Sequence, residues 1–256
     1  MKAIILAAGK GTRLGNLTKN KPKGMLNFNG KTLIEWQIEL YRKKFIEEII
    51  IVTGYKGHLI NYKDVKYYQN DNFDSTNMIE SLMVARNEFD DDVIVSYSDI
   101  IFSDLLLSNL IDLDKSICVS VDSDWKEYWL SRYGNIKQDL EDLKIADNGK
   151  IIHIGSQVSS NENLNYRYVG INKFSHNSLK LLENIYDIKR KKNENWKSSG
   201  EKFKLGYLTD LFQELIDNNI DVFASIYENN WLEIDTIRDY EIALKMHENK
   251  KFNIFN

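Results

Sequence analysis

The sequence contains very little cysteine and proline. Cys118 is the single cysteine among 256 residues, which excludes an intramolecular disulfide framework and a cysteine-based zinc site. Its apolar neighbours predict a buried structural thiol, and a lone reduced thiol fits the cytoplasm. The single proline is Pro22, against an ordinary frequency of about 5%. Its position therefore matters for the motif in which it lies.

Long apolar runs and an excess of positive charge are also missing. No stretch of about 18 apolar residues occurs, so we expect no membrane insertion. Met1-Lys2 leads directly into a short apolar run, which does not resemble a signal peptide. The formal net charge of −4 provides no global attraction for nucleic acid or anionic lipid. A hydrophobic content of 43% is ample for one large domain, and any phosphate binding must be local.

The first hundred residues alternate between strand and helix patterns. Apolar runs at 2–6, 48–53 and 92–97 predict buried strands. Helices are expected directly after the first strand, over 33–43, and from Asp74 onward with Met78 and Leu82 on the apolar face. Such alternation predicts an α/β domain with a mainly parallel sheet.

The second half is less regular. Aromatic and charged residues crowd into 124–129, and Asp147-Asn148-Gly149 predicts a hairpin turn. The polar stretch 189–204 is the best candidate for a mobile loop. The remaining expected elements are strands at 169–174 and 221–226 and helices around 178–189, 205–217 and 237–246.

A glycine-rich segment, Gly9-Lys10-Gly11-Thr12-Arg13-Leu14-Gly15, follows the first strand. Leu14 breaks the G-x-G-x-x-G fingerprint, and the spacing does not fit a P-loop. What remains is a tight loop that can bring backbone N–H groups against phosphates, with Lys10 and Arg13 to neutralise charge. The alternative for the segment taken alone is a plain glycine-rich turn.

Two further segments place carboxylates at strand ends. Asp99 follows the strand 92–97, where ligands gather in open α/β sheets, and its carboxylate suits Mg²⁺. Glu233 and Asp235 are two residues apart, which on a strand puts both on one face. The alternatives are a helix N-cap for Asp99 and, for Asp235, a strand end followed by a helix cap.

The combination Leu6-Ala7-Ala8-Gly9-Lys10-Gly11-Thr12-Arg13, then Lys21-Pro22-Lys23-x-Met25-Leu26, resembles the signature of the sugar nucleotidyltransferase superfamily. The resemblance implies a Rossmann-like, GT-A-like α/β fold in one domain, 1–256, with an acceptor-binding insertion at about 122–170. It also implies that Lys23 binds phosphate and that Asp235 joins Asp99 as a metal ligand. The sugar enzymes usually have prolines near Leu14-Gly15 and at Asn27, and this chain lacks them. The residues that the resemblance places around the triphosphate are Leu6, Ala8, Gly9, Lys10, Gly11 and Thr12.

Segments 51–55, 75–82 and 97–102 are similar to a narrower branch, the cytidylyltransferases that act on phosphocholine, 2-aminoethylphosphonate or phosphoglutamine. By position, Gly54, Tyr55, Asn77 and Ser81 would surround the base and ribose. Hydrogen-bond chemistry alone leaves CTP and UTP open. The alternatives are a cap or turn for Asn77 and a helix-surface hydroxyl for Ser81.

Aromatic residues between 125 and 168 are candidates for an acceptor pocket. Their faces, with the carboxylate of Glu233, suit an amino or quaternary ammonium group, and Arg167 suits a phosphate or carboxylate. The alternative is that these aromatics belong to the core. The candidates for acceptor binding are Trp125, Trp129, Tyr166, Arg167 and Glu233, with Tyr128 and Tyr168 nearby.

The resulting prediction is a Mg²⁺-dependent enzyme that transfers CMP from CTP to a small phosphate or phosphonate. Lys23 and Arg13 would stabilise the triphosphate, and Asp99 and Asp235 would hold the metal. The expected partners are CTP and that acceptor, with no nucleic acid, and a homodimer is the candidate assembly. The alternatives are a sugar-1-phosphate nucleotidyltransferase, a non-catalytic nucleotide-binding subunit and a GT-A glycosyltransferase; the last would be expected to show an Asp-x-Asp where Ser98-Asp99-Ile100 stands.

Overall fold

A seven-stranded sheet forms the centre of the computed structural model, which describes residues 1–157 and 164–249. Its order is β12-β8-β11-β6-β1-β4-β5. All neighbours are parallel except β11, which is antiparallel to both β6 and β8. The strands are β1 (Lys2–Ala7), β4 (Ile49–Thr53), β5 (Lys66–Gln69), β6 (Val93–Tyr97), β8 (Ile117–Asp122), β11 (Arg167–Phe174) and β12 (Phe223–Tyr227).

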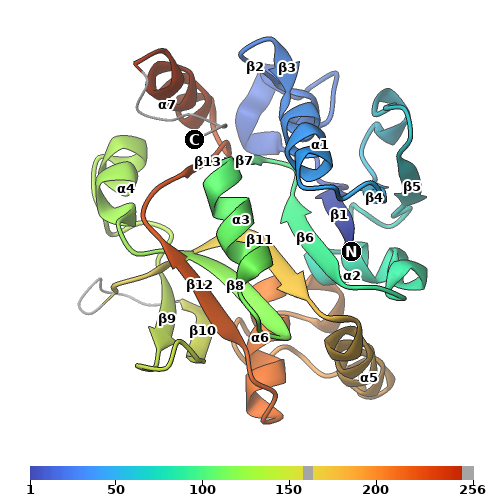
Figure 1. Cartoon of the computed structure of the whole chain (residues 1–256). Coiled ribbons are helices and arrows are strands. Elements are labelled where there is room, and N and C mark those ends of the chain that lie inside the picture. Colours follow the sequence, from blue (N-terminus) through green and yellow to red (C-terminus); the bar gives the residue numbers. More distant parts are fainter. Residues whose placement is uncertain (158–163, 250–256) are drawn as a thin grey trace.

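Helices cover both faces of this sheet, and Figure 1 shows α3 in front of it and α6 behind it. Alternate residues of β1 separate the two cores, since Ala3 and Ile5 join one apolar cluster and Ile4 and Leu6 the other. The first cluster includes α1 (Leu33–Lys43), α3 (Asp104–Asp112), α4 (Trp125–Tyr133) and α7 (Ile237–Glu248). The second includes α2 (Met78–Val84), α5 (His176–Lys192) and α6 (Leu208–Asp217). Within the described residues no helix is long and apolar enough to cross a membrane.

Local sequence explains most of these boundaries. A capping box between Thr32 and Glu35 starts α1, as the apolar spacing over 33–43 predicts. The helix expected from Asp74 begins at Met78 instead, because 70–77 form hydrogen-bonded turns. The helix expected after the glycine loop is only a 3₁₀ stretch, Thr12–Leu17, which is broken where Gly15 takes a φ of 53°.

The polar stretch 189–204, predicted as a mobile loop, is partly helical and has buried side chains that anchor it. The α5 helix continues through it to Lys192. Trp196 is fully buried, and its indole N–H donates to the carbonyl of Phe203 at 2.7 Å. Lys189 is also buried and pairs with Glu214 at 2.8 Å. One large aromatic side chain therefore anchors a segment that looks solvated in the sequence.

Between the adjacent strands β8 and β11 the chain forms α4 and a hairpin of β9 (Glu141–Ile145) and β10 (Ile151–Gln157). The turn predicted at 147–149 is confirmed. The α6 helix packs on β10 and connects the hairpin to the main body. Residues 158–163 of the insertion predicted at 122–170 lie outside the described residues. Two short pairs complete the fold: β2 (Asn27–Phe28) with β3 (Lys31–Thr32), and β7 (Ile100–Phe102) with β13 (Trp231–Glu233).

A buried charge network lies at the amino ends of the central strands. Glu88 is 4% exposed and contacts Lys2 at 3.0 Å, Tyr68 at 2.5 Å, and Lys66. Burial alone would raise the pKa of Glu88, but hydrogen bonds from Lys66, Tyr68 and Lys2 lower it from 4.5 to about 2. The folded state therefore favours the ionised carboxylate more strongly than the unfolded chain does.

This network predicts an acid-dependent loss of stability. Because the folded pKa of Glu88 is depressed, its contribution is present above pH 4.5 and disappears as the pH falls toward 2. A Glu88→Gln variant should lose about 1–3 kcal/mol of unfolding free energy at neutral pH, since Lys2 loses a buried partner. Urea unfolding between pH 7 and 2.5 measures the unfolding free energy of both proteins. The difference between wild type and variant should shrink as the pH falls below 4.5. A difference in unfolding free energy that stays constant over this pH range would contradict this account.

Candidate functional site

The carboxyl ends of β1 and β6 meet at one edge of the sheet, and two chain segments bring acidic residues to it. Asp99 lies in the turn between β6 and β7, so it is not a helix N-cap. The antiparallel pair β7 and β13 aligns Ile100 with Glu233, and the N–H of Ile234 donates to the carbonyl of Asp99 at 3.0 Å. This register places Asp235 beside Asp99 although they are 136 positions apart in the chain.

A buried glutamine holds the turn that carries Asp99. The amide nitrogen of Gln37 donates to the carbonyls of Tyr97 and Ile100, each at 2.8 Å. Its amide oxygen accepts from the hydroxyl of Ser96 at 2.8 Å. Helix α1 therefore fixes the backbone on both sides of Asp99, which limits how far its carboxylate can move.

Lys23 joins the two aspartates. Its ammonium lies 2.5 Å from Asp99 Oδ2 and 2.5 Å from Asp235 Oδ1. Arg13 adds a second cation, with its guanidinium 3.0 Å from the same Asp235 oxygen. Lys23 is 9% exposed and Asp235 is 6% exposed, so these charges interact with little screening by water. The structure brings together the four residues predicted to be catalytic.

The charges alter the proton affinities of this cluster. Burial lowers the pKa of Lys23, but the carboxylates of Asp99 and Asp235 outweigh it and the net pKa is raised. Burial raises the pKa of Asp235, but Lys23 and Arg13 reverse this and the net pKa is lowered. Lys23 is therefore held as a cation and Asp235 as an anion at neutral pH.

Behind Asp235 lies a fully buried arginine that the sequence analysis missed. Arg132 of α4 pairs with Asp239 at 2.9 Å and with Glu233 at 2.5 Å, and its guanidinium lies 3.4 Å from Asp235 Oδ2. Asp239 also accepts from the backbone N–H of Asp235 at 3.1 Å. Arg132 thus orients both acidic residues of this segment from the side away from Lys23.

The donor set fits a hard divalent cation. Asp99 Oδ1 is buried and has no hydrogen-bond partner in the described part of the chain, so one carboxylate oxygen is left available. Among the described residues no group of three or more His, Cys, Asp or Glu side chains could hold a metal. Mg²⁺ commonly takes one or two carboxylates and completes its shell with water and substrate phosphates. Asp99 and Asp235 match that pattern.

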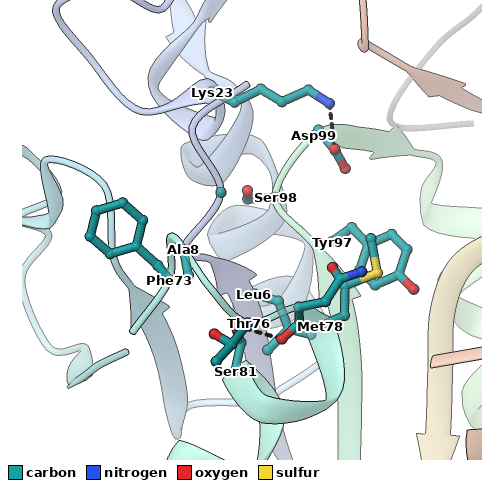
Figure 2. A pocket seen from close by; sticks show the side chains of 12 residues that line it. Leu6, Ala8, Lys23, Phe73, Thr76, Met78, Ser81, Tyr97, Ser98 and Asp99 are labelled. Atoms are coloured by element: carbon teal, nitrogen blue, oxygen red, sulfur yellow. Dashed lines mark hydrogen bonds and ion pairs between the residues drawn. The ribbon is translucent and has the colours of Figure 1, made fainter. Parts of the chain in front are cut away.

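A first pocket of about 130 Å³ opens beside Asp99, and Figure 2 shows its lining. Lys23 and Asp99 stand at one end of it, and Met78 and Ser81 stand at the other. Seven of the predicted residues line it: Leu6, Ala8, Gly9, Lys23, Asn77, Ser81 and Asp99. Phe73, Thr76, Met78, Tyr97 and Ser98 also line it and were not predicted as site residues.

The segment that follows β4 contacts the glycine loop and supports it. The N–H of Tyr55 donates to the carbonyl of Ala8 at 3.0 Å, and the ring of Tyr55 packs edge-on against Phe73. A shallow hollow of about 300 Å³ lies beside the loop, and its lining includes Lys10, Thr12 and Tyr55. Tyr55 therefore supports the loop and does not line the first pocket. Gly11, with a φ of 63°, lets the loop pass against the side chain of Lys23.

Gly54 carries a testable constraint. A Cβ at this position would lie 2.7 Å from the carbonyl oxygen of Ala8 and 2.8 Å from Cβ of Phe73, closer than real contacts allow. A Gly54→Ala change should push the glycine loop out of place and raise the KM for the nucleotide about tenfold or more. The KM for the second substrate should change much less. Steady-state kinetics with each substrate varied in turn would show this split, and equal increases in both constants would argue against it.

A second pocket of about 150 Å³ adjoins the first and shares Met78 and Tyr97 with it. Predicted residues Arg13, Arg167, Glu233 and Asp235 line it. The remaining lining residues are Asp139, Glu141, Tyr168, Val169, Tyr207 and Thr209. The cluster of Lys23, Asp99 and Asp235 therefore stands where two pockets meet.

The predicted aromatic pocket needs correction. Trp125 and Trp129 are 1% and 0% exposed, belong to the core, and line neither pocket. Trp129 contributes indirectly: the guanidinium of Arg167, which lines the second pocket, stacks on its ring at 4.3 Å from the centroid. Tyr166 also lines neither pocket and packs against the core on the other face of the sheet. Aromatic side chains on α4 gain more by packing between α7 and β13 than by facing solvent.

Comparison with known proteins agrees with this geometry. Residues 3–153 match the model of the MobA-like NTP transferase domain. The chain belongs to this family. The predicted α/β nucleotidyltransferase fold with a mostly parallel sheet is confirmed, and the relatives named below confirm the resemblance to the cytidylyltransferase branch.

Individual relatives support the same placement. The chain is 32% identical to CTP:phosphoglutamine cytidylyltransferase of Campylobacter jejuni, over 96% of this chain and 100% of that protein. It is 36% identical to choline-phosphate cytidylyltransferase of Streptococcus pneumoniae, over 57% of this chain and 62% of that protein. The structure of CTP:phosphocholine cytidylyltransferase (LicC) from Streptococcus pneumoniae superimposes with a TM-score of 0.76 at 26% identity, covering 96% of this chain and 98% of that one.

Proposed function

We propose that this protein is a cytidylyltransferase that transfers CMP from CTP to a small phosphate or phosphonate and releases pyrophosphate. The observation that carries the proposal is the meeting of Lys23, Arg13, Asp99 and Asp235 at the junction of two pockets. The activities named for the Campylobacter and Streptococcus relatives support this choice of nucleotide and acceptor class.

In this proposal the nucleotide occupies the first pocket. Asn77 and Ser81 would lie around the base and ribose, and the backbone N–H groups of the glycine loop would face the triphosphate. Gly54 and Tyr55, predicted for the base and ribose, would instead support that loop from outside the pocket. Lys10 and Thr12 line the hollow beside that loop. There the ammonium of Lys10 would interact with the departing phosphates. The acceptor would occupy the second pocket, with its phosphate toward Arg13.

The reaction is a direct displacement. An oxygen of the acceptor attacks the α-phosphorus of CTP, a new P–O bond forms, and the bond to the β-phosphate breaks as pyrophosphate leaves. Lys23 and Arg13 stabilise the negative charge at the reacting phosphates, and the rigid turn at Asp99 fixes their positions. Bound Mg²⁺, held by Asp99 and Asp235, would neutralise charge at the α-phosphate. No enzyme nucleophile is required.

Because Cys118 is free and buried, we propose the reducing cytoplasm as the setting.

Pyrophosphate release with a panel of substrates tests the proposal. The protein is incubated with Mg²⁺ and each of CTP, UTP, GTP and dTTP against phosphocholine, 2-aminoethylphosphonate, phosphoglutamine and sugar 1-phosphates. We expect release with CTP and at least one non-sugar acceptor. Release only with sugar 1-phosphates would move the protein to the sugar nucleotidyltransferases. Nucleotide binding without release in any combination would favour a non-catalytic subunit.

A further inference from the structure

The second pocket contains more negative than positive charge. Four carboxylates and two guanidinium groups line it. Three of these carboxylates have a cation beside them, within 3 Å in each case. The pairs are Asp139 with Arg167 at 2.7 Å, Glu233 with Arg132 at 2.5 Å, and Asp235 with Lys23 at 2.5 Å.

Glu141 is the exception. In the described part of the chain its carboxylate forms no ion pair and accepts no hydrogen bond, although Arg167 lies nearby. The guanidinium of Arg167 is already used, since it donates to Asp139 and stacks on Trp129. Burial raises the pKa of Glu141; Arg167 opposes this, and Asp139 adds to it. Glu141 is thus a partly buried carboxylate that has no matching cation among its described neighbours.

Glu141 and Glu233 lie in different parts of the pocket. Glu141 lies on β9, in the hairpin that packs on α6. Glu233 lies on β13, which pairs with β7 directly beside Asp99. Glu141 therefore stands away from the reacting phosphates, where the distal end of an acceptor would lie. Its neighbours on the pocket wall include Tyr168, Tyr207 and Thr209.

We propose that Glu141 binds a primary ammonium group at the far end of the acceptor and thereby determines acceptor specificity. This inference rests on the proposed cytidylyl transfer. The acceptor is then a zwitterion, with a phosphate or phosphonate held at Arg13 and an amine held at Glu141. Glu233 already forms an ion pair with Arg132 at 2.5 Å, whereas Glu141 has no ion pair among the described residues, so the amine is assigned to Glu141.

The lining favours a primary amine over a quaternary one. A primary ammonium offers N–H donors, which a carboxylate and the hydroxyl of Thr209 can accept. A quaternary ammonium has no donor and depends on aromatic faces around it. Here the rings of Tyr97 and Tyr168 pack edge-on against each other, with their hydroxyls 3.3 Å apart. Among the described lining residues only Tyr207 remains to offer an aromatic face, and one face does not surround a quaternary ammonium.

Matched acceptors and one substitution test the assignment. The acceptor 2-aminoethylphosphonate is compared with ethylphosphonate, which lacks only the amine, and phosphocholine supplies the quaternary case. Wild type should prefer the amine-bearing phosphonate by about ten- to hundredfold in kcat/KM. Glu141→Gln should abolish this preference through the KM for 2-aminoethylphosphonate, while the KM for CTP stays unchanged. Asp147→Asn is the matched control, because it removes the same charge from the exposed turn of the same hairpin.

Calorimetric titration of the same acceptors into both variants separates this proposal from the proposed function. Tighter binding of 2-aminoethylphosphonate than of ethylphosphonate, lost in Glu141→Gln and kept in Asp147→Asn, supports the role of Glu141 whatever the turnover. Equal binding of the two phosphonates by wild type, or an unchanged preference in Glu141→Gln, would overturn it while CMP transfer could still stand. A preference for phosphocholine over 2-aminoethylphosphonate would also overturn it.

Discussion

An Asp99→Asn variant is expected to lose about a hundredfold or more of kcat while keeping its fold. The substitution removes the negative charge from the oxygen that pairs with Lys23 and from the buried oxygen that has no partner among the described residues. Lys23 keeps Asp235 as its counter-ion, so the variant leaves no isolated buried charge. Steady-state rates at increasing Mg²⁺, with the unfolding temperature measured alongside, test this expectation.

Asp112→Asn provides the comparison, since it removes one carboxylate from the exposed end of α3. We expect this control to retain wild-type rates and the Asp99→Asn defect to persist at saturating Mg²⁺. Near-normal turnover of Asp99→Asn at saturating Mg²⁺ would remove Asp99 from the metal-binding set.

A Lys23→Met variant is expected to lose about a hundredfold of kcat and, at the same time, to bind Mn²⁺ more tightly in the absence of nucleotide. In the wild-type protein the ammonium lies 2.5 Å from one oxygen of each proposed metal ligand. A divalent ion must therefore compete with Lys23 until a triphosphate attracts the ammonium away. Removing the ammonium removes that competitor, and we expect Mn²⁺ affinity to rise about tenfold.

Electron paramagnetic resonance of free Mn²⁺ measures this second effect without turnover. Lys63→Met is the control, because Lys63 is exposed and outside both pockets. Equal or weaker Mn²⁺ binding by Lys23→Met would show that Lys23 does not compete with the metal. Such a result would leave only its role toward the phosphates.

The parts of the site that the sequence predicts are those with a local signal. Asp99 follows a strongly apolar strand, and the glycine loop follows another, so the carboxyl edge of the sheet brings them together. The role of Lys23 came from the resemblance. Helix α1 was also predictable, because its apolar spacing and its cap at Thr32 are contained within a few residues.

The parts that the sequence does not predict depend on distant partners. Arg132 acquires its role from Asp239, 107 positions away, and nothing near it in the chain indicates this. Glu141 is recognised as a carboxylate without an ion pair among the described residues only because the structure shows that Arg167 pairs with Asp139. Trp129 was expected in the pocket, but aromatic residues in a charged segment fit a buried and an exposed setting equally well until the helix packing is known.

Phosphorus NMR of one reaction mixture tests the central claim most directly. The protein is incubated with CTP, Mg²⁺ and a mixture of phosphocholine, 2-aminoethylphosphonate and phosphoglutamine, and the signals are followed in time. The account predicts that CTP and an acceptor disappear together, while pyrophosphate and a CMP-linked product appear in equal amounts. Unchanged CTP, or pyrophosphate formed with free CMP and unaltered acceptor signals, would contradict it.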